Sequence, residues 1–408
     1  MKILHTSDWH LGRRLCGRER RDEFQKFLTW LTGVLSKEKI DALIVAGDVF
    51  DSFTPPQWAQ TLYYDFLTRL SATPCKSAVI VAGNHDSPSL LDAPRELLKR
   101  LNVFVTGVPN GEHELCELPD PDGNTGAVCC AVPFLRSRDL CGAMEGMEPD
   151  ARRAAELEAF AAHYRDIVQR AEQLRAGRGI PIIATGHCFA AGGKVNEGDG
   201  VRDLAVGSVD VVPLSAFPNA VDYLALGHLH APQLCGALPS RRYSGSPLAM
   251  GFGEAGRPKE VVIADFGGRE PAVRALPVPV WQEIVRLRGT FDEIAARLDE
   301  LKLSGRSVWA EADCTDQGGA ELCERLHELA PDTGTVRLLR VRAAAENVGG
   351  TLAGDGDLNE DWAPQDVFEF YLKEHGIEGD EARELTGAYL EAVAAVREER
   401  DEAVQPAL

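Results

Sequence analysis

Short apolar runs that end in polar side chains recur through the first part of the chain. The runs are ILHTSDWH (3–10), LIVAGDVFD (43–51), VIVAGNHD (79–86), IIATGHC (182–188) and YLALGHLH (223–230). Continuous apolar runs of strand length, bounded by turn residues, are typical of strands buried on both faces. Each run therefore predicts a buried strand that delivers polar side chains from its end.

Between these runs, apolar residues recur at the three-and-four spacing of one buried helix face. Residues 21–39 show this pattern, a second helix begins after Pro55-Pro56, and a long helix is expected at about 149–176. Alternating strands and helices predict parallel strand pairing, with the loops at the C-terminal strand ends gathered together. The expected fold class is therefore α/β, with the polar strand ends close in space.

The pattern of the chain changes after residue 268. Three strand-like runs separated by two helical stretches predict a small α/β domain at 269–343, distinct from the first domain at 1–268. Residues 344–363 are rich in Gly, Asp, Asn and Ala and are expected to form a flexible linker. Two short helical patterns follow at 364–400, and this segment is the candidate for binding a partner.

Composition excludes several classes of protein. The chain of 408 residues is 44% hydrophobic, which allows one large domain and smaller additions. No apolar run approaches the ~20 residues of a membrane helix, and the opening MKILH lacks the pattern of a signal peptide. The ten cysteines show no C-x-x-C spacing, so neither a disulfide framework nor a zinc ribbon is supported. We expect a cytoplasmic protein with reduced thiols.

The formal net charge of -20 argues against broad binding of polyanions, which requires a basic face. A phosphate-ester substrate would therefore need cations supplied locally. The glycine-rich loop at 190–200 is not a phosphate-binding loop, because Cys188 and Val195 occupy positions that require Gly and Ser or Thr. No Walker A sequence exists in the chain, so any dependence on ATP must come from another protein.

The strand-end residues are of the types that bind metal ions. Asp8 and His10, and likewise His228 and His230, are two residues apart and would point the same way from an extended strand end. Asp48 supplies a carboxylate around which a two-metal centre could form. Nitrogen and oxygen ligands without thiolates suit manganese, iron or zinc better than calcium. Each motif alone is more often a hydrogen-bonded turn or loop, but their joint occurrence indicates a metal centre.

Taken in order, D-x-H, G-D-x-x-D, G-N-H-D, G-H and G-H-x-H are similar to the calcineurin-like metallophosphoesterase family. The opening KILHTSDWHLG and the later RYSGSPLAMGFGE resemble the DNA nuclease branch of that family in particular. The resemblance covers most of 1–268 and only the general organisation of the rest. It implies a β-sandwich flanked by helices, ligands at the strand ends, a small capping domain and C-terminal helices.

The resemblance also implies a ligand set for two divalent ions, with manganese the expected metal. One ion would be held by Asp8, His10, Asp48 and His230, and the second by Asp48, Asn84, His187 and His228. Asp48 would then bridge the two ions. Two divalent cations against two carboxylates leave the centre positive, so it can hold a phosphodiester despite the acidic chain.

The resemblance makes His85 the acid that protonates the leaving oxygen, with Asp86 orienting its imidazole or raising its basicity. The alternative for His85 is a histidine that only orients ligands. Asp51 could orient a ligand or a water, or merely cap the following turn. Cys188 is interpreted as a thiol of the core.

Several basic side chains are candidates for contacting DNA. The arginines near the first motif are Arg13, Arg14, Arg18, Arg20 and Arg21, and Arg242 and Tyr243 precede SGSP. Guanidinium groups pair with phosphate through two hydrogen bonds, so the arginines could grip the DNA backbone as a group. For each arginine alone, a solvated loop or helix start is the alternative, and for the later pair it is strand packing.

Three functions remain open. The first is a manganese-dependent nuclease subunit, both exonuclease and endonuclease, acting on DNA ends and hairpins in repair and recombination. The second is a small-molecule phosphodiesterase or phosphatase, and the third is a scaffold for a partner. The extra domain and tethered helices favour the first, because a small phosphoester needs no distant docking element.

The resemblance implies that the partner is an ATPase with a coiled coil, bound in a heterotetramer that contains two copies of this chain. The aromatic residues Phe368, Tyr371 and Tyr389 suit docking of a helix into a groove of that partner. They could equally form a small hairpin that is complete in itself.

Overall fold

The structure is a computed structural model of the chain. It describes residues 1–141, 147–192, 211–331 and 334–344, together with Phe368, Leu372, Thr386 and Tyr389. Residues 1–344 form one compact unit and residues 345–408 a second. The expected linker at 344–363 lies outside the described residues except for Ala344, and so does most of the segment at 364–400.

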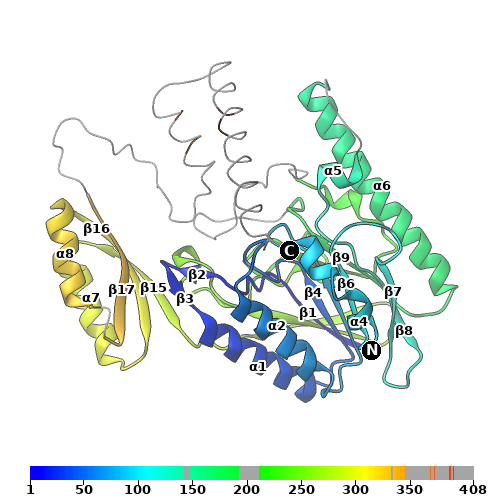
Figure 1. The fold of residues 1–408 in the computed structure, drawn as a ribbon, viewed down its shortest axis with the longest axis horizontal. Coiled ribbons are helices and arrows are strands. Elements are labelled where there is room, and N and C mark those ends of the chain that lie inside the picture. The colour runs from blue at the N-terminus through cyan, green and yellow to red at the C-terminus, as the bar shows by residue number, and fades with distance from the viewer. Residues whose placement is uncertain are drawn as a thin grey trace, which may run out of the picture. The chain divides into compact units, whose positions relative to one another are not determined.

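Two six-stranded sheets pack face to face (Figure 1). The first has the order β14-β13-β1-β4-β5-β6 and comprises β1 (Lys2–Thr6), β4 (Ala42–Ala46), β5 (Ser77–Val81), β6 (Val103–Thr106), β13 (Glu260–Phe266) and β14 (Pro271–Pro277). Strands β1, β4, β5 and β6 are parallel, as the alternation of strands and helices predicts, whereas β13 and β14 are antiparallel.

The second sheet has the order β11-β12-β10-β9-β8-β7. Its strands are β7 (Leu115–Pro119), β8 (Thr125–Cys130), β9 (Ile182–His187), β10 (Tyr223–Gly227), β11 (Gln233–Leu234) and β12 (Arg241–Tyr243). The four central strands β8, β9, β10 and β12 are parallel, and the two edge strands are antiparallel.

Helices cover the outer face of each sheet. Helices α1 (Arg21–Lys37) and α2 (Gln57–Leu70) pack on the first sheet, and α6 (Pro149–Arg175) packs on the second. Shorter elements complete this part: β2 (Arg14–Leu15), β3 (Arg18–Glu19), α3 (Pro88–Asp92), α4 (Arg95–Lys99), α5 (Ser137–Leu140), η1 (Leu214–Ala216) and η2 (Phe252–Glu254). Since each fully buried Leu, Ile or Val contributes about 1.5–3 kcal/mol, the central strands make a rigid base for the loops at their ends.

A small α/β domain follows. It contains β15 (Glu283–Gly289), α7 (Phe291–Leu303), β16 (Val308–Gln317), α8 (Gly319–Leu329) and β17 (Val336–Ala344). The three strands form a parallel sheet with a core of their own. Strand β14, which lies beyond the boundary predicted at residue 268, pairs with β13 along its whole length. Strand β14 is an edge strand with mostly exposed or half-buried side chains, so it shows no apolar run.

All ten cysteines are free thiols in the structure. Among the described helices, none is both long enough and apolar enough to cross a bilayer.

The rings of Phe368 and Tyr389 stack with their centroids 4.3 Å apart, a contact expected of the hairpin alternative. Tyr371 lies outside the described residues.

Candidate metal centre

The loops that follow β1 and β4 run side by side at the carboxyl ends of the strands. The N–H of Asp8 donates to the Gly47 carbonyl and the N–H of His10 to the Asp48 carbonyl, both at 3.0 Å. The ends of β5, β9 and β10 add Asn84, His187 and the residues after Gly227. The five apolar runs thus bring their polar ends to one place.

One group of ligand atoms comes from Asp8, His10 and His230. The Nε2 atoms of His10 and His230 face each other at 3.1 Å, and His10 Nε2 lies 3.6 Å from Asp48 Oδ2. Two imidazole nitrogens that converge in this way are typical of ligands to a shared cation. All three side chains are buried.

A second group surrounds Asn84. His187 Nε2 and His228 Nδ1 each lie 3.0 Å from Asn84 Oδ1, and His187 Nε2 lies 3.3 Å from Asp48 Oδ2. Asp48 therefore contacts both groups of side chains. This is the arrangement that a carboxylate shared between two ions requires.

Left-handed backbone, rather than extended strand ends, aims several of these side chains. The φ angles are 52° at Asp8, 46° at His10, 50° at Asp48 and 99° at His228. Residues other than glycine seldom adopt positive φ, and such conformations cluster at functional sites where the surrounding structure holds them. The prediction that Asp8 and His10 point the same way because the strand is extended is wrong, although the two side chains do meet.

The glycines before the ligands leave room that a Cβ would occupy. A Cβ on Gly83 would overlap the side chain and the backbone nitrogen of Asp48. A Cβ on Gly227 would overlap the carbonyl oxygen of Ala46 on the neighbouring sheet. Close approach of the two sheets at their carboxyl ends therefore depends on these glycines.

We expect Gly83→Ala to displace Asp48 and to abolish binding of both metal ions, because its Cβ meets backbone as well as the carboxylate. Metal content by mass spectrometry and the thermal midpoint would measure the effect. Gly33→Ala is the matched control, since a Cβ there meets nothing and helix α1 should gain about 0.5–1 kcal/mol. A Gly83→Ala protein with full metal content would contradict the assignment.

The electrostatics of the buried groups fit divalent cations. Burial lowers the pKa of His187, but the Asp48 carboxylate outweighs it and raises that pKa to about 9. Burial raises the pKa of Asp48, yet His187 and His85 hold it well below its usual range. Burial and then repulsion by His187 lower the pKa of His228 to about 3. A proton on His187 thus supplies positive charge beside Asp48 that a metal ion would replace, and the thiolate-free donor set suits such an ion.

His85 lies at the rim of the centre. Its Nδ1 atom lies 3.0 Å from the carbonyl oxygen of Asp51, and its ring meets that of His10 edge to face at 4.9 Å between centroids. The backbone N–H of His85 donates to Asp48 Oδ1 at 2.9 Å. The imidazole is therefore oriented by a main-chain carbonyl and placed directly beside the ligands.

Asp86 contacts main-chain groups of two loops. Its carboxylate accepts hydrogen bonds from the N–H groups of Val49, Phe50 and Gly83 at 2.8–3.0 Å. Burial and repulsion by Asp48 raise the pKa of Asp86 to about 6, against the effect of these N–H donors. Asp86 ties the loop after β4 to the loop after β5, and so it supports Asp48 and Asn84 indirectly.

The carboxylate of Asp51 faces two side chains. Its Oδ1 atom lies 3.3 Å from His10 Nδ1 and 3.3 Å from Arg13 Nη1. This contact agrees with the alternative in which Asp51 orients a ligand. Cys188 is buried, as expected of a core thiol, and burial raises its pKa.

The candidate DNA contacts divide into buried and exposed groups. Arg13 is buried beside Asp51, and Tyr243 is fully buried, donating its hydroxyl to the Cys188 carbonyl at 2.8 Å. Arg242 is largely covered and pairs with Glu260 at 2.8 Å. In the structure these three side chains make contacts within the protein, and their contact with DNA stays a prediction.

The other arginines near the first motif have mixed surroundings. Arg20 is buried in an ion pair with Glu23, whereas Arg14 is exposed on β2 and pairs with Glu19. Arg18 is half buried on β3, and Arg21 is exposed at the start of α1. Arg14, Arg18 and Arg21 therefore remain candidates for phosphate contacts.

Sequence reasoning missed two features near the centre. Glu254 lies behind His230, with Oε1 3.0 Å from His230 Nδ1; its only signal was its place in the motif RYSGSPLAMGFGE. Phe53 is 54% exposed two residues after Asp51, and the guanidinium carbon of Arg136 lies 5.7 Å from its ring centroid. No motif marks this pair, because its two members are far apart in the chain.

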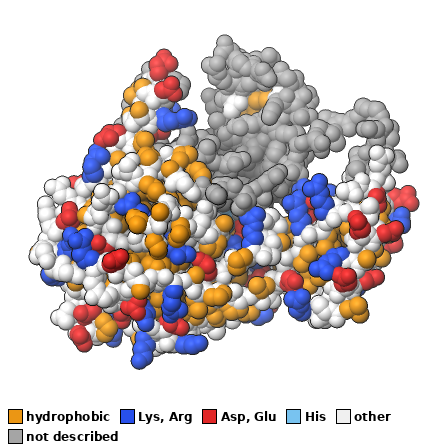
Figure 2. All heavy atoms as spheres, turned by 180° about the vertical axis from the view of Figure 1, so that it is seen from behind, with side chains coloured by type: hydrophobic (Ala, Val, Ile, Leu, Met, Phe, Trp, Pro, Cys, Tyr) orange, Lys and Arg blue, Asp and Glu red, His pale blue; other side chains and the backbone are white. Residues whose placement is uncertain are grey.

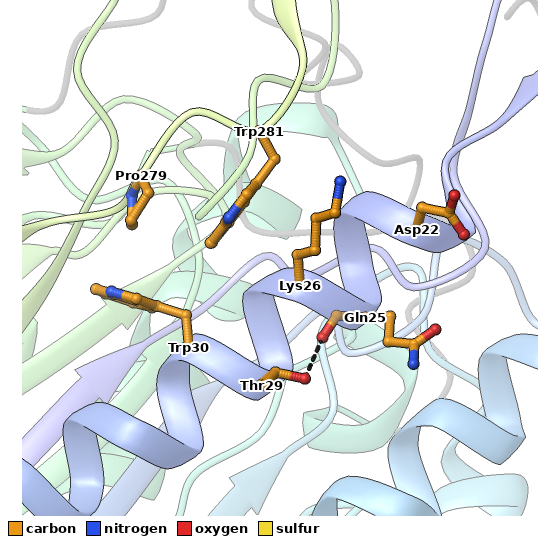
Figure 3. A pocket seen from close by; sticks show the side chains of 7 residues that line it. All are labelled: Asp22, Gln25, Lys26, Thr29, Trp30, Pro279 and Trp281. Carbon is orange, nitrogen blue, oxygen red and sulfur yellow. Dashed lines mark hydrogen bonds between the residues drawn. The ribbon is translucent and has the colours of Figure 1, made fainter.

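A cavity of about 490 Å³ lies between α1 and the segment after β14 (Figure 3). Its walls include Trp30, Trp281 and Pro279, and the two indole rings lie 6.4 Å apart. None of the strand-end histidines or carboxylates lines it. This cavity is therefore separate from the strand-end centre.

Two helix-covered sheets, with Asp, Asn and His side chains gathered at the carboxyl ends of their strands, define a metallophosphoesterase with a divalent-metal centre. Residues 1–232 match the calcineurin-like phosphoesterase family, and residues 280–376 match the family described as the type 5 capsule protein repressor C-terminal domain. The chain thus belongs to the calcineurin-like phosphoesterase family and, within it, to the group of the SbcD chains of the SbcCD nuclease.

Three relatives support this placement, and each is named as the SbcD chain of the SbcCD nuclease. That of Escherichia coli K12 is 38% identical over 349 residues, which cover 85% of this chain and 86% of the relative. That of Rhodobacter capsulatus is 39% identical over 318 residues, covering 75% and 77%. That of Bacillus subtilis is 32% identical over 346 residues, covering 81% and 84%.

Proposed function

We propose that this chain is a metal-dependent DNA nuclease subunit that hydrolyses phosphodiester bonds at DNA ends and hairpins. The observation that carries the proposal is the gathering of seven carboxylate, amide and imidazole side chains, Asp48 among them, at one place in a chain whose relatives are named nuclease subunits. A small-molecule phosphodiesterase is the less favoured alternative, because the likeness to these relatives extends over 85% of the chain.

The residues present would hold two divalent ions, and manganese is the ion we propose. One would be bound by Asp8, His10, Asp48 and His230, and the other by Asp48, Asn84, His187 and His228. When bound, such ions lower the pKa of a water and stabilise charge on phosphate oxygens. Acidic and basic side chains are interspersed on the described surface seen in Figure 2, so local cations are the best means of holding phosphate there.

His85 would deliver the proton that the leaving oxygen needs. With Nδ1–H donating to the Asp51 carbonyl, Nε2 is left to carry and release that proton. Asp51 also faces His10 and Arg13, so one loop sets the positions of the acid and of a ligand. Asp86 holds that loop against Gly83.

The test of this function is an assay of the purified chain with Mn²⁺ on blunt DNA, hairpin DNA and a small phosphodiester. Each substrate is tested with and without an SbcC-type ATPase and ATP. We expect cleavage of DNA, strengthened by the partner. Hydrolysis of the small phosphodiester alone, with no cleavage of either DNA under any condition, would contradict the proposal.

We further propose a cytoplasmic assembly in which residues 364–400 bind the coiled coil of an SbcC-type ATPase. Two copies of this chain would take part in a heterotetramer that acts on DNA. The support is the SbcCD name of the relatives and the division of the chain into a unit of residues 1–344 and a second unit of residues 345–408.

We expect a chain that ends at Ala343 to keep its metal ions and to lose the ATPase partner. Residues 1–344 form a compact unit, so the truncation leaves the metal centre supported. Metal analysis and a pull-down with an SbcC-type ATPase would measure both properties against the full chain. Undiminished capture of the ATPase would refute the role of residues 364–400.

We expect Phe53→Ala to weaken binding of DNA with unpaired ends by about 5–100-fold, because stacking of a base on an aromatic ring contributes about 1–3 kcal/mol. Phe53 is exposed beside the loop that holds His85, and Arg136 adds a cation at its ring. Hydrolysis of a small phosphodiester should not change. Tyr64→Ala on α2, where the ring is also exposed, is the control in fluorescence-anisotropy titrations. Equal binding by Phe53→Ala and the unaltered chain would contradict the assignment.

A further inference from the structure

Glu254 and Lys259 form a buried ion pair directly behind His230. Glu254 Oε1 lies 3.0 Å from His230 Nδ1, and Glu254 Oε2 pairs with the Lys259 ammonium. Lys259 also donates to the His230 carbonyl at 3.0 Å and to Ser246 Oγ at 2.8 Å. The imidazole and the main chain of His230 are thus held by the same pair of charges.

This support differs from that of His187, one of the two histidines in the second group. His187 Nδ1 lies 2.9 Å from a main-chain carbonyl, that of Ala46 in the rigid first sheet. A carboxylate behind a ligand histidine fixes the tautomer and ring orientation and makes the imidazole more basic. His230 therefore depends on a side chain, and so on whatever places that side chain.

Glu254 ends the η2 turn, and the start of that turn is anchored on the small domain. Phe252 is buried in a cluster with Ile284 of β15, Trp309 of β16 and Leu15 of the β2–β3 hairpin. Glu254 lies two residues after Phe252. The N–H of Met250 and the ammonium of Lys259 donate hydrogen bonds to its carboxylate. One three-residue turn thus joins the small domain to His230.

The packing on the remaining side of this turn is open. A cavity of about 970 Å³ is lined by Glu254 and Lys259 and, from the small domain, by Ile284, Arg286 and Arg306. The η2 turn packs on the small domain through Phe252 and faces this cavity. It can therefore move with the small domain without disrupting a close-packed core.

We propose that Glu254 is a positioning residue for the ion held by His230, and that the η2 turn makes this position depend on the small domain. The inference rests on the proposed metal centre and adds its regulation: docking of the small domain selects between an aligned and a misaligned His230. In the described part of the chain, His187, which would hold the other ion, is supported by the main chain of β4.

The decisive test compares two double variants of the full chain. Glu254→Gln/Lys259→Met and Glu254→Met/Lys259→Met both remove the buried charge pair, and they differ in whether an acceptor still faces His230 Nδ1. Each metal-stripped protein is titrated with MnCl₂ by calorimetry, and electron paramagnetic resonance follows formation of the coupled pair of ions. In the Glu254→Met/Lys259→Met variant, we expect the affinity of one of the two Mn²⁺ binding events to fall about 10–100-fold. The Glu254→Gln/Lys259→Met variant should recover most of that loss of affinity.

The coupling to the small domain is tested by Phe252→Ala. It should weaken the same event about 2–30-fold and leave the other unchanged, whereas Leu303→Ala on the exposed face of α7 should change neither. Equal Mn²⁺ affinities for the two double variants, or equal loss at both events, would overturn the positioning role. Wild-type binding by Phe252→Ala would overturn the coupling. An unaltered chain that binds no Mn²⁺ would instead refute the metal centre itself.

Discussion

Asp48→Asn is expected to remove both metal ions and to lower DNA cleavage on the order of 10³-fold or more. Asn keeps an oxygen to accept the His85 N–H, now 2.9 Å from Asp48 Oδ1, so the loop should keep its shape. It loses the negative charge that faces His10 at 3.6 Å and His187 at 3.3 Å. Because both groups of ligands share this carboxylate, neither ion should stay in place.

Metal content and calorimetric titration with MnCl₂ measure the result for Asp48→Asn. Asp51→Asn is the informative comparison, since Asp51 contacts His10 alone among the proposed ligands; it should weaken one ion about 10–100-fold and spare the other. Asp65→Asn on the exposed face of α2 serves as the surface control. One full equivalent of tightly bound Mn²⁺ in Asp48→Asn would show that Asp48 is not shared.

His85→Ala is expected to lower DNA cleavage by about 10²–10⁴-fold while both ions stay bound. The imidazole lies beside the ligands but is held by the Asp51 carbonyl at 3.0 Å, so its loss removes the proton donor and not a ligand. His327→Ala on the exposed face of α8 is the matched control. Metal analysis and DNA-end degradation are measured on the same preparations.

The leaving group gives a sharper test of the acid role of His85. The nitrophenolate that leaves from a nitrophenyl phosphodiester is a stable anion and needs little protonation. The His85→Ala variant should therefore retain most of the activity on that substrate. A similar loss on nitrophenyl and DNA substrates would point to a role in ligand orientation instead. An active variant on DNA would exclude the acid role altogether.

Asp51 and Asp86 show which contacts near His85 a sequence motif can predict. The motif GNHD places Asp86 next to His85, and adjacency in the chain suggested a pair. In the folded chain, Asp86 accepts three backbone N–H groups from two loops, and Asp51, which is 34 residues away, supplies the carbonyl that meets His85. Short motifs report residue types and order, but partners across two loops depend on how the loops pack.

The sequence by itself determined the buried strands, their parallel order and the identity of the side chains at their ends. These follow from local patterns, since apolar runs and turn residues act over a few positions. Helices α1, α2 and α6 and the alternation of strands and helices from β15 to β17 could be predicted in the same way. Edge strand β14 could not, because an exposed strand carries no apolar run.

Only the tertiary structure decided how the side chains meet. Left-handed backbone at Asp8, His10 and Asp48 aims ligands that an extended strand would have pointed elsewhere. The fold buries the side chains of Arg13 and Tyr243, and it places Glu254 behind His230 across 24 residues of chain. The physical reason is that these contacts join segments far apart in sequence, and the packing of two sheets and a small domain, rather than any local pattern, brings them together.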